Sequence, residues 1–70
     1  MVNASQIKEQ MEVKSADGKH IGSVDSMEGR RVKLAAAGMH HYIDLAVVDA
    51  IKDGTVCLSK TAEETMRTWH

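Results

Sequence analysis

Aromatic residues are almost missing from this 70-residue chain, which has one Trp, one Tyr and no Phe. The core must therefore be built from aliphatic side chains, Met and Ala. Proline is absent, so no Pro-rich linker divides the chain. The length is enough for one domain, and we expect residues 1–70 to form it.

Cysteine occurs once, as Cys57, so the chain cannot form an internal disulfide. No apolar run is long enough to span a bilayer. The first residues also lack the basic and apolar regions of a signal peptide. These features predict a cytoplasmic protein that works in a reducing compartment without membrane insertion.

Neither sign of charge dominates, because nine Lys and Arg face ten Asp and Glu, for a net charge of −1. No overall field therefore draws the protein to phosphate backbones or anionic lipid. The best basic cluster consists of Lys19, Arg30, Arg31 and Lys33, and it contains no aromatic residue for base stacking. We do not expect nucleic acid to be the main partner.

Glycine marks the turns. The pairs Asp17-Gly18, Glu28-Gly29, Ala37-Gly38 and Asp53-Gly54 predict turns, because Gly tolerates the left-handed backbone conformation. Short strands are predicted between them, at residues 11–14, 20–26, 31–34, 41–45, 47–51 and 55–58. This spacing predicts a mostly β fold, a small barrel of about five to six short antiparallel strands, in which Gly18 and Gly54 shape turns.

One strand is irregular. Ile21 and Val24 are three residues apart, so they cannot share a face of a regular strand. A bulge or sharp bend at Gly22 would turn both side chains inward.

Both ends of the chain have helical signals. Thr61 and Glu64 form a capping-box pattern, which predicts a C-terminal helix. Ala62, Met66 and Trp69 follow at helical spacing, and Trp69 is predicted to latch the helix onto the core. Residues 3–6 predict a short N-terminal helical turn.

The order and spacing of these segments resemble the PRC-barrel-like superfamily. The similar stretches are Ile7 to Val13, Asp17-Gly18-Lys19-His20-Ile21-Gly22-Ser23-Val24-Asp25, His40 to Leu45 and Leu58 to Trp69. More specifically, the chain is similar to a group of short bacterial proteins of unknown function assigned to that superfamily. Relatives include the cytoplasmic domain of a photosynthetic reaction-centre subunit and part of a ribosome maturation factor. The resemblance implies a small β-barrel that works through macromolecular contacts, and it transfers no catalytic residue.

Histidines are the main candidates for metal chemistry. His40 and His41 are adjacent, so on a strand they would point to opposite faces and would not readily bind one ion together. His20 is distant in sequence, and no metal-ligand spacing is present. We therefore expect no metal or other cofactor, and no catalytic site, since no nucleophile–base or acid–base constellation is visible.

A protein–protein contact is the function that this pattern favours. The sequence predicts a non-enzymatic interaction module with an unknown protein partner. A small core favours oligomers, and a homodimer is the expected form. The candidate interaction residues are Tyr42, His40, Val47, Arg30 and Arg31. Two alternatives stay open: a metal- or small-ligand-binding protein using the His40-His41 segment, and a ribosome- or RNA-associated factor by fold analogy.

Overall fold

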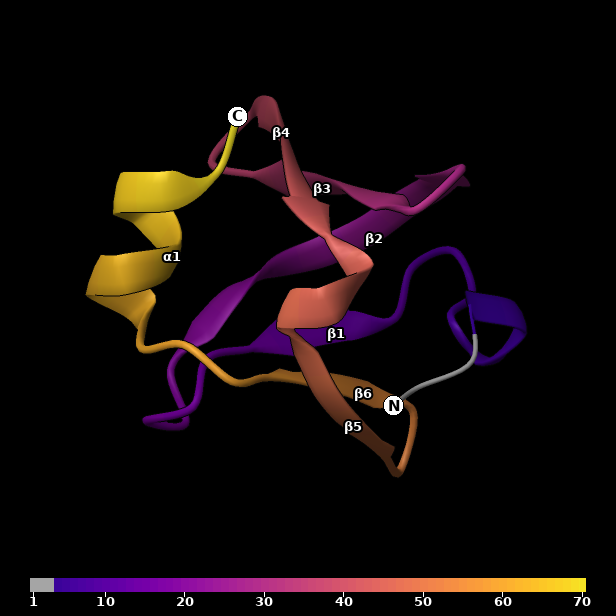
Figure 1. Cartoon of the computed structure of the whole chain (residues 1–70), viewed down its shortest axis with the longest axis horizontal. Helices are drawn as coiled ribbons and strands as arrows, with labels where there is room; N and C mark the ends of the chain where they lie inside the picture. Colours follow the sequence, from indigo (N-terminus) through magenta and orange to yellow (C-terminus); the bar gives the residue numbers. More distant parts are fainter. Residues whose placement is uncertain (1–3) are drawn as a thin grey trace.

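The computed structural model describes residues 4–70, and its regular elements follow the turn signals of the sequence (Figure 1). In chain order they are η1 (Ala4–Gln6), β1 (Glu12–Lys14), β2 (His20–Glu28), β3 (Arg31–Ala36), β4 (Met39–Asp44), η2 (Leu45–Val47), β5 (Val48–Lys52), β6 (Thr55–Leu58) and α1 (Ala62–Thr68). All six predicted strands are present, and the fold is mostly β with a C-terminal helix.

The helical elements are short. At the N-terminal end, η1 is a single 3-10 turn, and the predicted helical turn begins at Asn3, which lies outside the described residues. At the other end, α1 has seven residues. Within residues 4–70, no helix combines the length and the apolar character that crossing a bilayer requires.

The β3–β4 and β5–β6 hairpins turn at the predicted dipeptides. Ala37 and Gly38 have φ values of 52° and 78°, and Asp53 and Gly54 have φ values of 51° and 74°. Two consecutive left-handed residues match the twist of the strands that they join, so they form a tight hairpin. The turn glycine before β2, Gly18, is also left-handed, with φ 82°.

The six strands form one mixed sheet in the order β4-β3-β2-β1-β6-β5. β1 pairs with β6 in parallel, with Val13 opposite Val56, and the other ladders are antiparallel. β4 and β5 are the two edges, and the chain passes between them through η2. The predicted antiparallel barrel is therefore corrected to an open, curled, mixed sheet. The parallel pair joins segments far apart in the sequence, which no local turn signal reveals.

Gly22 lies at a bulge in β2, as the sequence predicts. Ile21 is an extra residue at this point of the β1–β2 ladder, and both Ile21 and Val24 are buried. A Cβ atom added to Gly22 would lie against the carbonyl oxygen of Ala35 in β3, closer than real Cβ atoms approach. Only glycine fits between the two strands here.

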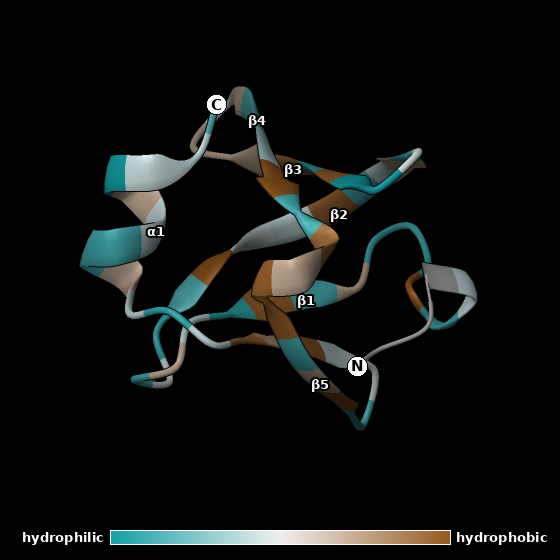
Figure 2. Cartoon of the chain, viewed as in Figure 1, coloured by the Kyte–Doolittle hydropathy of each residue, from teal (hydrophilic) through white to brown (hydrophobic). Residues whose placement is uncertain are grey.

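The core is aliphatic and follows the alternation of the strands. Val13, Val32, Leu34 and Val56 have no exposed surface. Hydrophobic stretches recur along the strands of the curled sheet, and much of the outer side of α1 is hydrophilic (Figure 2).

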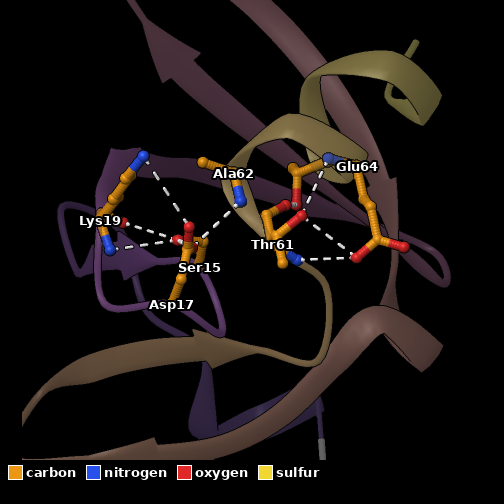
Figure 3. A network of polar contacts seen from close by, with 7 residues as sticks. Ser15, Asp17, Lys19, Thr61, Ala62 and Glu64 are labelled. Atoms are coloured by element: carbon orange, nitrogen blue, oxygen red, sulfur yellow. Dashed lines mark hydrogen bonds and ion pairs between the residues drawn. The ribbon is translucent and has the colours of Figure 1, made fainter.

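The start of α1 has the predicted capping box (Figure 3). The Glu64 N–H donates to the Thr61 hydroxyl at 3.2 Å, and the Thr61 N–H donates to the Glu64 carboxylate at 3.2 Å. These two hydrogen bonds satisfy donors that lack partners at the beginning of a helix.

The buried face of α1 differs from the predicted one. Ala62 and Thr65 are buried, whereas Met66 is 51% exposed, so the predicted position of Met66 in the apolar stripe is wrong. A spacing of three residues from Ala62 reaches Thr65, and its hydroxyl is satisfied in the interior because it donates to the Thr61 carbonyl at 2.8 Å. Trp69 follows the helix, is half-buried and packs against the core.

Candidate functional site

A cleft of about 160 Å³ lies between α1 and the sheet edge formed by β4. Its walls come from β3, β4, η2, the segment before α1, α1 itself and the residues after it. The lining residues are Arg31, Tyr42, Ile43, Asp44, Val47, Lys60, Thr65, Thr68 and His70. The cleft therefore combines aliphatic, aromatic, hydroxyl and charged side chains from both halves of the chain.

Tyr42 is held on both its backbone and its side chain. Its N–H donates to the carbonyl of His70 at 2.9 Å, and its carbonyl accepts the N–H of His70 at 3.0 Å. This is the hydrogen-bond pattern of an antiparallel pair, so the tail (Trp69 and His70) covers part of the β4 edge. The Tyr42 hydroxyl donates to the Glu28 carboxylate at 3.2 Å.

The tail is also held by an aromatic stack. The rings of His41 and Trp69 have centroids 3.8 Å apart and an interplanar angle of 5°. Stacked ring pairs of this kind contribute beyond the area that they bury. Backbone pairing at Tyr42 and ring stacking at His41 thus act on consecutive residues of β4.

The histidines do not converge. His40 lies 4.0 Å from the Asp25 carboxylate, His20 lies 3.0 Å from the Glu12 carboxylate, and His41 stacks on Trp69. Across residues 4–70, no three His, Cys, Asp or Glu side chains form a group that could hold a metal ion.

The predicted basic cluster is divided by ion pairs. The Lys33 ammonium lies 3.6 Å from Asp25, and the Lys19 ammonium lies 4.0 Å from Asp17. Arg30 and Arg31 are exposed and have no ion-pair partner in the described part of the chain. Only Arg31 lines the cleft.

Two further charged groups complete the cleft. The Lys60 ammonium donates to the Thr68 hydroxyl at 3.3 Å. Asp44 lies opposite Arg31 in the β3–β4 ladder, and its carboxylate accepts the N–H of Ala46 at 2.9 Å. Cations and a carboxylate therefore lie on the same face of the molecule.

The beginning of α1 is fastened to the β1–β2 turn by Asp17 (Figure 3). The Ser15 hydroxyl donates to this carboxylate, which also accepts the N–H of Ala62 at 3.2 Å. The Ser15 hydroxyl, with smaller effects from Ala62 and Lys19, holds the pKa of Asp17 below its usual value against the opposing effect of desolvation. At the capping box, the backbone N–H and hydroxyl of Thr61 lower the pKa of Glu64.

A second, shallower depression of about 440 Å³ includes Lys14, Asp49 and Cys57 in its lining. Cys57 is half-buried, and its thiol lies 3.9 Å from the Thr55 carbonyl. Neither His nor a second carboxylate lines this depression to activate the thiol.

Three of the five predicted interaction residues meet at the cleft: Arg31, Tyr42 and Val47. His40 and Arg30 do not line it. The sequence reasoning missed Lys60, Thr68 and His70 because a residue's place opposite β4 depends on how α1 docks. The only available signal was the capping box, which fixes where the helix begins but not what it faces.

The comparisons with known proteins identify a family. Residues 7–66 match the family described as "Uncharacterized protein conserved in bacteria (DUF2171)". The match covers well over half of the chain, so the chain belongs to this family of bacterial proteins. No curated protein and no solved structure matches it at a significant level.

Proposed function

We propose that this member of the bacterial family is a non-enzymatic interaction module that binds a second copy of itself through the cleft face. The cleft face is defined here by Arg31, Tyr42, Val47 and Lys60. The observation that carries the proposal is the meeting of the half-buried Tyr42 and the unpaired Arg31 guanidinium at one cleft. Aromatic residues and Arg are the residue types most enriched at protein interfaces.

Charge supports a second copy as the partner. Arg31 and Lys60 lie on the same face as Asp44, and Glu28 contacts Tyr42 there. A two-fold interface places the same patch on both subunits, so a patch with both signs can complement itself. A small core and the β5 edge, which pairs with no further strand of the described residues, also favour association.

The fold supports a place in the PRC-barrel-like superfamily. We base this proposal on the curled six-stranded sheet, the bulge at Gly22 and the C-terminal helix. Relatives in that superfamily act through macromolecular contacts. The lone Cys57 supports a reducing, cytoplasmic compartment.

Light scattering after gel filtration, over a range of protein concentrations, tests the proposal. We expect the mass to rise from monomer to dimer, and Tyr42→Lys to weaken the dimer because it adds a cation beside Arg31. Gln10→Lys is the matched control, because Gln10 is exposed and does not line the cleft. A constant monomer mass at high micromolar concentration would contradict self-association, and a dimer equally stable in Tyr42→Lys would contradict this interface.

A further inference from the structure

We propose that the C-terminal arm, residues 61–70, is exchanged between two copies, so that the arm of each copy docks against the β4 edge of the other. The exchange rests on the proposed self-association and specifies its geometry. The occupant of the β4 edge in the dimer is thus the arm of a second copy.

The arm is held mainly at its two ends. At its beginning, the Ala62 N–H donates to Asp17 at 3.2 Å, and the side chains of Ala62 and Thr65 are buried. At its end, His70 pairs with the backbone of Tyr42, and Trp69 stacks on His41.

Beyond the buried Thr65 the arm packs incompletely, and the Lys60 ammonium donates to the Thr68 hydroxyl there at 3.3 Å. The cleft of about 160 Å³ lies between α1 and β4, so this stretch is not filled by side chains. The outer side of the arm is exposed at Glu63, Glu64 and Arg67, and Met66 is 51% exposed. An element with little buried apolar surface opens at a low free-energy cost.

The β4 edge also shows how an extended segment binds there. Two backbone hydrogen bonds to Tyr42 and one ring stack on His41 recognise the tail. A strand edge accepts any segment that presents the same groups, in the manner of strand addition. A second copy carries an identical tail, so it can form each of these contacts between molecules.

Exchange preserves the contacts of the arm and adds an interface between the two bodies. Such swapping is a low-cost route to a dimer. The hinge is short, because only Ser59 and Lys60 separate β6 from the cap residue Thr61. The Lys60 carbonyl accepts the N–H of Ala16 at 2.8 Å, so the hinge is fastened to the β1–β2 turn directly before the arm begins.

The test is a complementation between two full-length variants. His41→Ala removes the ring on the edge, and Trp69→Ala removes the ring on the arm. Each variant alone has no His41–Trp69 stack in either a closed or an exchanged state. A mixed dimer with exchanged arms regains one stack, because the intact Trp69 of one chain meets the intact His41 of the other.

Equal amounts of the two variants are unfolded together, refolded by dilution and weighed by native mass spectrometry. Arm exchange predicts that the ratio of mixed dimer to homodimers exceeds its statistical value roughly fivefold, because only the mixed dimer gains a stacked ring pair. The control mixes His40→Ala with Trp69→Ala, because His40 contacts Asp25 and not the arm. With exchanged arms, the mixed dimer then has one stack, which is the mean of the two stacks in the His40→Ala homodimer and the absence of a stack in the Trp69→Ala homodimer. In this control, mixed dimers should make up half of all dimers, which is the share expected from random pairing. Circular dichroism checks the folding of each variant, and Trp69→Leu replaces Trp69→Ala if the latter does not fold.

Statistical mixing of His41→Ala with Trp69→Ala would overturn arm exchange. If the wild-type protein were still a dimer in that case, the proposed self-association through the cleft face would stand with closed arms. A wild-type protein that stays monomeric would overturn both the exchange and the self-association.

Discussion

At the scale of single residues, Asp17 joins the β1–β2 turn to the beginning of α1. Its carboxylate accepts the N–H of Ala62, a helix donor without an intrahelical partner. The carboxylate also faces the positive end of the helix dipole. The charge of Asp17 therefore favours the docked position of a helix that is distant from it in sequence.

Asp17→Asn should lower the Tm at neutral pH. The Ser15 hydroxyl, followed by the Ala62 N–H, lowers the pKa of Asp17 in the folded protein. The stability that this charge contributes is complete above the unfolded pKa and is lost as the pH falls through the folded pKa. The difference in Tm between wild type and Asp17→Asn should therefore shrink below about pH 4.

Thermal melts between neutral pH and about pH 2 measure this difference. Asp49→Asn is the matched control, because Asp49 is exposed and makes no hydrogen bond to the described residues through its side chain. An Asp17→Asn effect that stays constant over this pH range would show that the charge does not hold the helix.

Gly22→Ala should destabilise the protein by about 2 kcal/mol, within the usual range for overpacking. A new Cβ would meet the Ala35 carbonyl oxygen, and the β2 and β3 backbones would have to separate. In a regular strand, the same substitution normally stabilises, because Gly has more conformational freedom to lose. Urea denaturation measures the change. A Cβ atom added at Gly38 would lie in open space, so Gly38→Ala costs only the strain of a left-handed φ of 78°. A larger loss of stability for Gly38→Ala than for Gly22→Ala would contradict this account.

At the scale of elements, α1 cannot be stable on its own. Helices of seven residues are too short to form in isolation, so its caps and its contacts must hold it. The capping box was predictable because its two residues are three apart in the sequence. The stack of Trp69 on His41 was not, since it depends on where the tail crosses β4.

Trp69→Ala should cost about 2 kcal/mol of unfolding free energy, less than for a fully buried ring, because Trp69 is only half-buried. Part of this loss is the stack with His41. A double-mutant cycle with His41→Ala should give a coupling energy of about 1 kcal/mol. Met66→Ala is the control with an expected change within about 0.5 kcal/mol, because Met66 is 51% exposed. An additive double mutant would show that the stack does not contribute.

The positions of the strands in the sequence were more predictable than the pairing of the strands in the sheet. Hairpin turns such as Asp53-Gly54 are local signals, and they place the ends of consecutive strands. The β1–β6 pairing depends on a contact between Val13 and Val56, and no turn connects these residues. The error at Met66 arose from spacing alone: positions three and four residues after Ala62 both fit a helical face, and packing selected Thr65.

At the scale of the whole molecule, the cleft shows what a sequence can and cannot reveal about a site. Tyr42 and Arg31 were chosen from their residue types and strand positions, and both line it. Lys60 and His70 join them only because the helix returns across the sheet edge. Residue chemistry is thus visible in the sequence, whereas convergence requires the tertiary fold.

The charge distribution of the whole molecule predicts weak binding to RNA. Of the four basic residues singled out in the sequence, only Arg30 and Arg31 lack an ion-pair partner in the described part of the chain. Two phosphate contacts to a single strand predict a slope of log K against log salt of only about −1.4. The net charge of −1 adds no long-range attraction.

Mobility-shift titrations with single-stranded RNA at several salt concentrations measure this slope. We expect a dissociation constant of about 10⁻⁴ M at physiological salt, typical of non-specific binding. Arg30→Ala and Arg31→Ala should each reduce the slope by about half, because each removes one phosphate contact. Lys33→Ala is the control and should change the slope little, since the Lys33 ammonium lies 3.6 Å from Asp25. A sequence-selective complex that persists at high salt would contradict the expectation, because it would require base contacts that this arrangement of cations does not provide.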